Sequence, residues 1–281
     1  MVREAVSMDE TLLTFDEFLK RACPSLDLDW RRYRRRESRR RTRDRIHELG
    51  LADYAAYLRR LREDPQEARG LANLMRVTVT RFFRERATWQ AVADSILPRL
   101  AAEAPDGALR ALSVGCAGGE EPYSLALVWL HCVQPRYPRH QMRVLATDID
   151  QTNLSRAARG LYNVGSLREV PHEIREAWFH AAPSGHLRLD SAVGTVVSFQ
   201  RCDLLSDPLP SGFDVVLCRY LAFTYFLGER RELAARQLGA ALRPGGFLVI
   251  GRNERLDARI AGFDAWPNHP GVYTATGAHS R

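Results

Sequence analysis

After residue 108 the sequence alternates short apolar runs with longer stretches of helical periodicity, and this alternation restricts the fold more than any other feature. Short apolar runs are typical of strands buried on both faces, and helices between such strands are typical of a mostly parallel sheet. The predicted strands are Leu109–Val114, Arg143–Thr147, Val196–Phe199, Phe213–Cys218 and Phe247–Ile250. The predicted helices are Glu121–Val133, Asn153–Arg159 and Arg230–Leu242, the last closed by the turn Arg243–Gly246. We therefore expect an α/β fold with helices on both faces of the sheet.

Between Glu169 and Phe199 the alternation is interrupted. Leu187–Asp190 and Val193–Ser198 suggest the two strands of a short antiparallel hairpin. We expect this hairpin to be an insertion near the sheet, at about residues 180–198.

The first part of the chain has helical periodicity instead. Thr14 or Asp16 is suited to cap a helix through Phe18 and Leu19, and further aromatic and aliphatic residues recur at helical spacing. We expect a small helical domain over residues 1–85. Residues 86–107 then form an amphipathic connecting helix and a linker, and residues 108–281 form the α/β domain.

Composition excludes several classes of protein. The chain is 45% hydrophobic and 27% charged without a long apolar run, which predicts a globular protein and no membrane insertion. The N-terminus lacks the pattern of a secretory signal, and five widely spaced cysteines favour a reducing cytoplasm. Neither a Cys-x-x-Cys pair nor a histidine cluster is present, so no metal site is expected.

The net charge of +7 is concentrated in one segment. Arg31–Arg45 contains ten arginines against Glu37 and Asp44. Such a run is either a solvated helix face or a surface that attracts an acidic partner. Nucleic acid ranks below an acidic protein, because the run is not interleaved with aromatic residues that could stack on bases.

The turn after the first predicted strand is the most informative candidate site. Ligands of open α/β sheets bind where the strands end, and Gly115, Gly118 and Gly119 lie at this position. Glu120 and Glu121 follow at the positive end of the next helix, where two carboxylates would repel a pyrophosphate. The only lysine is Lys20, which excludes a Gly-Lys-Ser/Thr phosphate loop. A cationic nucleoside without phosphate, S-adenosylmethionine, fits better.

Residues at the ends of the other strands support an adenosine site. Asp148 ends the second predicted strand, where a carboxylate can accept both ribose hydroxyls. Asp203 follows the third and could receive the adenine amino group, and Arg219 and Tyr220 follow the fourth. Each residue alone could be an ordinary turn residue, whereas together they favour adenosine.

These motifs resemble those of the chemotaxis receptor methyltransferases (CheR type), which transfer methyl from S-adenosylmethionine to receptor glutamates. The resemblance covers about residues 14–275. It rests on Thr78–Arg84, Gly115–Ser124, Ala146–Asp150, Phe213–Arg219 and Arg243–Gly246. It implies a class I methyltransferase Rossmann-like sheet after a helical domain. The cofactor positions that it implies are Thr78, Thr80, Arg84, Glu121, Asp148, Asp203, Leu204, Arg219 and Tyr220; with Gly115 of the turn they are the expected cofactor site.

The chain departs from the family at several of these positions. Thr78, Asp203 and Tyr220 replace the asparagines that are usual there, and Gly251-Arg-Asn-Glu254 replaces Gly-His-Ser-Glu. Compared with the family pattern, we expect one extra residue between Arg219 and Tyr225. These departures affect the expected identity of the substrate more than that of the cofactor. The short hairpin resembles that of members that do not dock a receptor tail.

A glutamate acceptor needs no general base, because its reference pKa of about 4.3 leaves it ionised at neutral pH. We expect Arg84, together with Tyr225, to orient the acceptor carboxylate by charge-assisted hydrogen bonds. The alternative is that Arg84 only pairs with Glu120 or Asp148 to shape the site. The arginine run would contact an acidic protein such as a receptor helix. Two further alternatives remain: methylation of a small acid or another protein, and a non-catalytic sensor of S-adenosylmethionine.

Overall fold

The computed structural model describes residues 13–75, 80–257, 260 and 262–276, and the chain divides into two compact units. The first unit comprises Met1–Val77 and Thr224–Arg230, and the second comprises Thr78–Phe223 and Arg231–Arg281. The sequence analysis placed the end of the helical domain at residue 85. The first unit ends earlier, at Val77, and takes in a second segment from far along the chain.

The first unit is helical, and its first helix is set by a capping box. Its elements are α1 (Phe15–Ala22), η1 (Pro24–Leu26), η2 (Trp30–Tyr33), α2 (Arg36–Glu48), α3 (Tyr54–Glu63) and α4 (Pro65–Leu74). The Thr14 hydroxyl accepts from the Glu17 N–H, and the Glu17 carboxylate accepts from the Thr14 N–H. Of the two predicted caps, Thr14 is therefore the one used. The core centres on four stacked or tilted rings, those of Phe15, Phe18, Tyr54 and Tyr57.

Residues 224–230 join this unit through backbone pairing. Leu28 and Phe226 form an isolated antiparallel bridge. The Asp29 N–H donates to the Tyr225 carbonyl at 3.0 Å, and the Leu227 N–H donates to the Asp27 carbonyl at 2.7 Å. Such non-local pairing has no signature in the local sequence, which explains why a linear division of the chain missed it.

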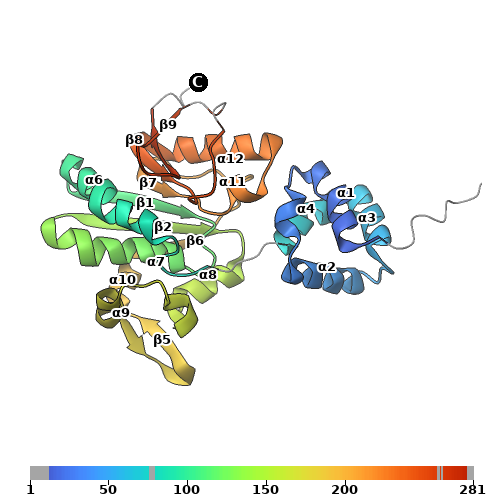
Figure 1. The fold of residues 1–281 in the computed structure, drawn as a ribbon, viewed down its shortest axis with the longest axis horizontal. Coiled ribbons are helices and arrows are strands. Elements are labelled where there is room, and N and C mark those ends of the chain that lie inside the picture. Colours follow the sequence, from blue (N-terminus) through green and yellow to red (C-terminus); the bar gives the residue numbers. More distant parts are fainter. Residues whose placement is uncertain (1–12, 76–79, 258–259, 261, 277–281) are drawn as a thin grey trace, which may run out of the picture. The chain divides into compact units, whose positions relative to one another are not determined.

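The second unit contains a seven-stranded sheet in the described part of the chain, with the order β6-β2-β1-β7-β8-β10-β9 (Figure 1). The strands are β1 (Ala108–Val114), β2 (Gln141–Asp148), β6 (Val197–Arg201), β7 (Phe213–Leu217), β8 (Leu242–Val249), β9 (Phe263–Ala265) and β10 (Val272–Ala275). All neighbours pair in parallel except β10, which is antiparallel to β8 and β9. From β1 the chain adds β2 and β6 on one side and then returns to add β7 and β8 on the other side of β1. Ligands of open α/β sheets bind at such a switch point, so we expect the site at the carboxyl ends of β1 and β7.

The predicted α/β fold is confirmed, with differences at its edges. The five predicted strands correspond to β1, β2, β6, β7 and β8, whereas β9 and β10 were not predicted. Both are short strands at one end of the sheet, too brief for a periodic pattern, and β9 is its edge strand. Strand β8 begins at Leu242, so Arg243–Gly246 lies within the strand rather than in a closing turn.

Helices connect the strands of this sheet along the chain. They are α7 (Glu120–Leu127), continued by the π-helical η4 (Val128–Val133) and by η5 (Gln134–Arg136), and then α8 (Gln151–Ala158), α11 (Ala222–Tyr225) and α12 (Gly228–Ala241). The predicted connecting helix is observed as α5 (Arg86–Ala91), the π-helical η3 (Val92–Ile96) and α6 (Leu97–Glu103). Val92, Ile96 and Leu100 are fully buried, so this helix is part of the core of the second unit rather than a linker.

The expected insertion is a three-stranded antiparallel sheet with the order β3-β5-β4, which stands apart from the main sheet in Figure 1. Its elements are β3 (Leu161–Asn163), η6 (Val164–Leu167), α9 (His172–Trp178), β4 (Phe179–Ala181), η7 (Pro183–Gly185) and β5 (His186–Leu189). The prediction that Val193–Ser198 is a hairpin strand is wrong. Asp190 caps a helix, α10 (Ser191–Val196), which leads directly into β6 of the main sheet. The true hairpin joins β4 to β5.

Candidate active site

The turn between β1 and α7 is tied to the end of β2. The N–H groups of Gly115 and Cys116 donate to the Thr147 carbonyl at 2.7 and 2.9 Å. Gly115 and Gly119 have φ of +73° and +88°, a region that favours glycine. A Cβ at Gly115 would lie 2.6 Å from Leu221 Cδ2, and one at Gly119 would lie 2.8 Å from the Ala157 Cβ. These glycines therefore allow close packing of the protein itself as well as the turn.

Asp148 lies at the end of β2, as predicted, and is buried. Its Oδ2 accepts from the Ala117 N–H and its Oδ1 from the Asp150 N–H, both at 2.9 Å. These bonds fix the carboxylate in the glycine turn. Each oxygen keeps acceptor capacity, because a carboxylate oxygen can accept two hydrogen bonds. The geometry therefore suits a carboxylate that accepts two neighbouring hydroxyls.

Asp203 and Leu204 follow β6 and lie beside the end of β2. The Cys202 N–H donates to the Asp148 carbonyl at 3.1 Å and joins the two segments. Asp203 Oδ1 accepts from the Leu205 N–H at 3.0 Å, and Oδ2 accepts from the Ser206 hydroxyl at 3.3 Å. Leu204 is buried. Asp203 thus shapes the loop after β6 with its own side chain.

The two adjacent glutamates at the start of α7 have different surroundings. The Glu121 carboxylate accepts from the Ser113 hydroxyl at 2.9 Å and lies 3.4 Å from Arg219 Nη1. Burial raises the pKa of Glu121, against the opposing effects of Arg219 and Ser113. Glu120 is buried beside Arg156, its Oε2 lacks a hydrogen bond among the described residues, and burial also raises its pKa. Only Glu121 joins the network described below.

Arg219 is the centre of a buried ionic network. It follows β7 and its side chain is 3% exposed. Its Nη2 donates to Glu85 Oε2 at 2.9 Å and to the Arg84 carbonyl at 2.7 Å, while Nη1 faces Glu121. The guanidinium also lies over the Trp89 ring, 5.3 Å from its centroid. One cation therefore holds two carboxylates and the Arg84 segment together.

Glu85 is a member of this network that the sequence analysis did not single out. It accepts from the Tyr220 hydroxyl, from Arg219 and from the Arg252 N–H. Burial raises the pKa of Glu85, but these hydrogen bonds outweigh burial and hold the pKa below its usual value. The only available signal was its place directly after the Thr78–Arg84 motif. Glu254 was also missed, and it accepts from the N–H groups of Tyr220 and Gly251.

Arg84 stacks its guanidinium on the Tyr220 ring, 3.8 Å from the ring centroid. Its carbonyl accepts from Arg219 and from the Trp89 indole N–H at 3.0 Å. Within the described part of the chain, its guanidinium makes no ion pair with Glu120 or Asp148. The alternative in which Arg84 only neutralises one of these acids therefore has no support in the geometry.

The backbone around the site is strained at four non-glycine positions. Phe83, Glu85, Ala117 and Tyr220 have positive φ values of +52°, +66°, +48° and +57°. Left-handed conformations cost about 1–3 kcal/mol each for such residues and persist only where surrounding contacts enforce them. Here the contacts are known: the Phe83 N–H donates to the Ser124 hydroxyl, and the other three residues take part in the bonds above.

The remaining predicted site residues, Thr78, Thr80 and Tyr225, take part in none of the site contacts above. Thr78 falls outside the described residues. Thr80 is described and is half-buried. Tyr225 belongs to the helical unit, where its buried ring lies 5.1 Å from the ring of Tyr33 between centroids. The structure thus brings Arg84, Glu121, Arg219 and Tyr220 together around Glu85, while Tyr225 packs within another unit.

The donor set favours a cationic ligand over a metal or a phosphate. Among the described residues, no group of three or more His, Cys, Asp or Glu side chains is placed to hold a metal ion. The described helices also include none that is long and apolar enough to cross a bilayer. The turn carries buried carboxylates on β2 and α7. Such a site attracts a sulfonium or ammonium group and repels a pyrophosphate.

Comparisons with known proteins agree with this site. Residues 78–269 match the family described as CheR methyltransferase, SAM binding domain. The chain is 31% identical to a chemotaxis protein methyltransferase of Listeria monocytogenes, over 89% of this chain and 91% of the relative. It is also 31% identical to a probable chemotaxis protein methyltransferase of Rhizobium etli, over 75% of this chain and 81% of the relative. The chain therefore belongs to the CheR methyltransferase family and is an S-adenosylmethionine-dependent methyltransferase.

Proposed function

We propose that this methyltransferase acts on a glutamate side chain of an acidic protein, a chemoreceptor, and forms a glutamyl methyl ester. The names of its relatives support a chemotaxis substrate. The observation that carries the proposal is the state of Arg84. Arg219 forms ion pairs with Glu85 and Glu121, whereas Arg84 forms no ion pair among the described residues and is held on the Tyr220 ring. Arg84 acts on the nearby Glu121 carboxylate only from beyond ion-pair distance. An acceptor carboxylate would supply the missing partner.

Transfer to a carboxylate fits the absence of histidine from the network. S-adenosylmethionine supplies an activated methyl group; a carboxylate oxygen bonds to the methyl carbon as the carbon–sulfur pair of electrons returns to sulfur, which leaves S-adenosylhomocysteine. The acceptor is ionised at neutral pH, so no side chain has to remove a proton. The residues have to hold the acceptor in line, which is worth about 7–11 kcal/mol of the barrier.

For Arg84 we propose the role of orienting this acceptor. The Tyr220 ring and the bonds to the Arg84 carbonyl restrict the segment on which the guanidinium stands. One charge-assisted hydrogen bond to a single acceptor oxygen leaves the other oxygen free to attack. Tyr220 thereby acts as a positioning residue, and Glu85 fixes its hydroxyl.

The remaining predicted positions form the proposed cofactor site. Asp148 would accept the ribose hydroxyls, and Glu121 would face the cationic end of the cofactor. Asp203 and Leu204 would border the adenine. The other proposed contacts are Thr78, Thr80, Gly115, Arg219 and Tyr220.

The arginine run provides a surface for the acidic partner. Helix α2 buries Ser38, Thr42 and Ile46 on one face, so most of its arginines lie on the others. Several of the ten are paired within the unit, for example Arg45 with Glu67 at 2.7 Å. The set that is exposed and has no ion pair among the described residues is Arg35, Arg36, Arg39 and Arg43. We propose that these four contact the acidic protein.

A second candidate is methylation of a small acid or of another protein. The proposed contact of Arg84 involves only the carboxylate of the acceptor, and a small carboxylic acid offers the same group.

Incubation with methyl-labelled S-adenosylmethionine separates these candidates. Membranes that carry chemoreceptors should gain label that mild base releases as methanol. Receptors whose methylated glutamates are changed to glutamine should gain none. Base-labile label on a small acid or a different protein, with receptors unlabelled, would support the second candidate and reject the first. Binding without transfer to any acceptor would instead support a sensor.

A further inference from the structure

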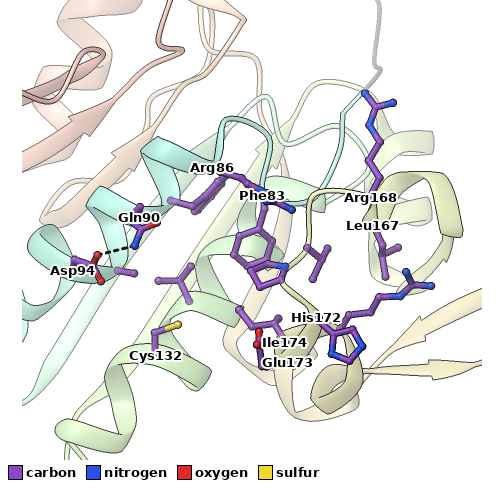
Figure 2. Close-up of a pocket in the computed structure, with 16 residues that line it drawn as sticks. Phe83, Arg86, Gln90, Asp94, Cys132, Leu167, Arg168, His172, Glu173 and Ile174 are labelled. Atoms are coloured by element: carbon purple, nitrogen blue, oxygen red, sulfur yellow. Dashed lines mark hydrogen bonds between the residues drawn. The ribbon is translucent and has the colours of Figure 1, made fainter.

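A cavity of about 610 Å³ lies in the second unit (Figure 2). Its walls come from α5 and η3, from η4, and from the segment between η6 and α9. This volume is within the range of about 300–1,000 Å³ that is typical of small-molecule sites. None of the predicted cofactor residues that the structure describes lines it.

The cavity and the active site share one wall. Phe83 and Trp89 line the cavity, and both also contact the active-site segment. The Trp89 indole N–H donates to the Arg84 carbonyl, and the Trp89 ring carries the Arg219 guanidinium. A molecule in the cavity would therefore touch the back of the segment that holds Arg84.

Two π-helical turns border the cavity. Ala93 and Asp94 come from η3, and Val128 and Cys132 come from η4. π-Helical turns are rare and occur often at functional sites, because the extra residue per turn displaces side chains from regular packing. Two such turns beside one cavity indicate that the cavity is part of the fold rather than a packing defect.

The lining combines an apolar floor with a charged rim. The floor consists of buried side chains, namely Phe83, Trp89, Val128, Leu167, Val170 and Ile174. On the rim, Asp94 accepts from Gln90 at 3.1 Å, and Arg168 lies 3.9 Å from Glu169. By contrast, the guanidinium groups of Arg86 and Arg175 make no hydrogen bond or ion pair among the described residues. The rim thus offers two uncommitted guanidinium groups above an apolar floor.

We propose that this cavity binds a small organic anion with an aromatic ring. The ring would cover Phe83 and Ile174, and the anionic group would lie between Arg86 and Arg175. Charge complementarity selects an anion, since the rim acids Asp94 and Glu173 would repel it less than the three rim arginines attract it. The apolar floor selects a ring over a free phosphate, whose hydration such a floor cannot replace.

The test uses two fluorescent probes that share a ring system and differ in charge. These are 8-anilinonaphthalene-1-sulfonate, an anion, and N-phenyl-1-naphthylamine, which is uncharged. The folded full chain should bind the sulfonate at one site and more tightly than the amine. Saturating S-adenosylhomocysteine should leave the sulfonate bound. Displacement by S-adenosylhomocysteine would place the probe in the cofactor site and overturn the proposal.

Variants locate the probe. Arg86→Ala and Arg175→Ala should each weaken sulfonate binding about tenfold and leave amine binding unchanged, because each removes one charge-assisted hydrogen bond. Arg143→Ala, an exposed arginine on β2 outside the cavity, should change neither. Ala93→Trp should fill the cavity and abolish the binding of both probes, provided that its circular dichroism and unfolding match the wild type.

Two results would overturn the proposal. One is equal weakening by Arg143→Ala and Arg86→Ala, which would show a general surface charge effect. The other is undiminished sulfonate binding by folded Ala93→Trp, which would show that the probe binds elsewhere. Because neither measurement involves methyl transfer, the proposal stands or fails independently of the acceptor.

Discussion

Arginine is used in opposite ways in the two units. In the helical unit ten arginines crowd one segment, and those on the outer faces of α2 remain in water. In the second unit a single arginine, Arg219, is 3% exposed and holds two carboxylates. An exposed ion pair contributes about 0–1 kcal/mol, whereas removing one partner from a buried pair costs about 3–5 kcal/mol. Burial, rather than the number of charges, decides which arginine the fold depends on.

Arg219→Met should therefore show the largest effect, a loss of about 3–5 kcal/mol in the free energy of unfolding of the second unit. Glu85 and Glu121 would stay buried without their cation. Urea unfolding followed by circular dichroism measures the loss. The matched change at an exposed arginine of α2, Arg43→Met, should alter stability by less than about 0.5 kcal/mol. Equal losses of stability from the buried and the exposed change would show that burial does not decide which arginine the fold depends on.

Arg84→Ala tests an arginine beside the network that forms no ion pair among the described residues. We expect methyl transfer to fall about 100-fold or more, because the acceptor loses its orienting charge. Affinity for S-adenosylhomocysteine, measured by calorimetry, should change by less than about threefold, and Arg84→Lys should recover part of the rate. A large loss of cofactor affinity would make Arg84 a cofactor residue instead. Arg143→Ala serves as the control for loss of an exposed arginine.

Glu121 should make the affinity for S-adenosylmethionine depend on pH. Burial raises its pKa in the free protein, so as pH falls it becomes neutral at a higher pH than an ordinary glutamate. Affinity for cationic S-adenosylmethionine should then fall with decreasing pH, by up to about tenfold per pH unit below that pKa. S-adenosylhomocysteine lacks the sulfonium and should respond less. Glu121→Gln should flatten the dependence; an unchanged slope would exclude Glu121 as its source.

The exposed arginines should show the smallest effect per residue. Changing Arg35, Arg36, Arg39 or Arg43 singly to glutamine should weaken binding of the acidic protein about two- to fivefold at low salt. The effect should shrink as salt rises, since exposed charges are screened within about 8–10 Å at moderate ionic strength. Binding measured at several salt concentrations tests this. Arg45→Gln serves for comparison, because Glu67 already compensates Arg45. Wild-type affinity that is independent of salt would remove the proposed role.

The sequence predicted the sheet better than its edges. Strands such as β1 and β7 consist mostly of buried apolar residues, so the local sequence predicts them and the turns that follow them. Helix α10 was mistaken for a strand because Val193 and Val196 favour strands, while the Asp190 cap that starts the helix was not weighed. The pairing of Leu28 with Phe226 links segments far apart in sequence, and no local pattern encodes it.

For the candidate site, the sequence indicated positions but not partners. Strand ends place Asp148 and Arg219 correctly, because the carboxyl ends of parallel strands meet at one edge. The role of Glu85 depends on a positive φ and on three donors from different segments, which only the folded chain brings together. The same holds for Glu120 and Glu121, which are adjacent in sequence but take up different surroundings.

The left-handed residues Phe83, Glu85, Ala117 and Tyr220 have a consequence for how ligands bind. Their conformational cost is met when the chain folds, so it need not be met again when a ligand arrives. Binding free energy is then available for alignment instead of for ordering loops, which is the advantage of preorganisation. Glycine at any of these positions would ease the backbone, yet it would return to the free protein the disorder that folding had removed.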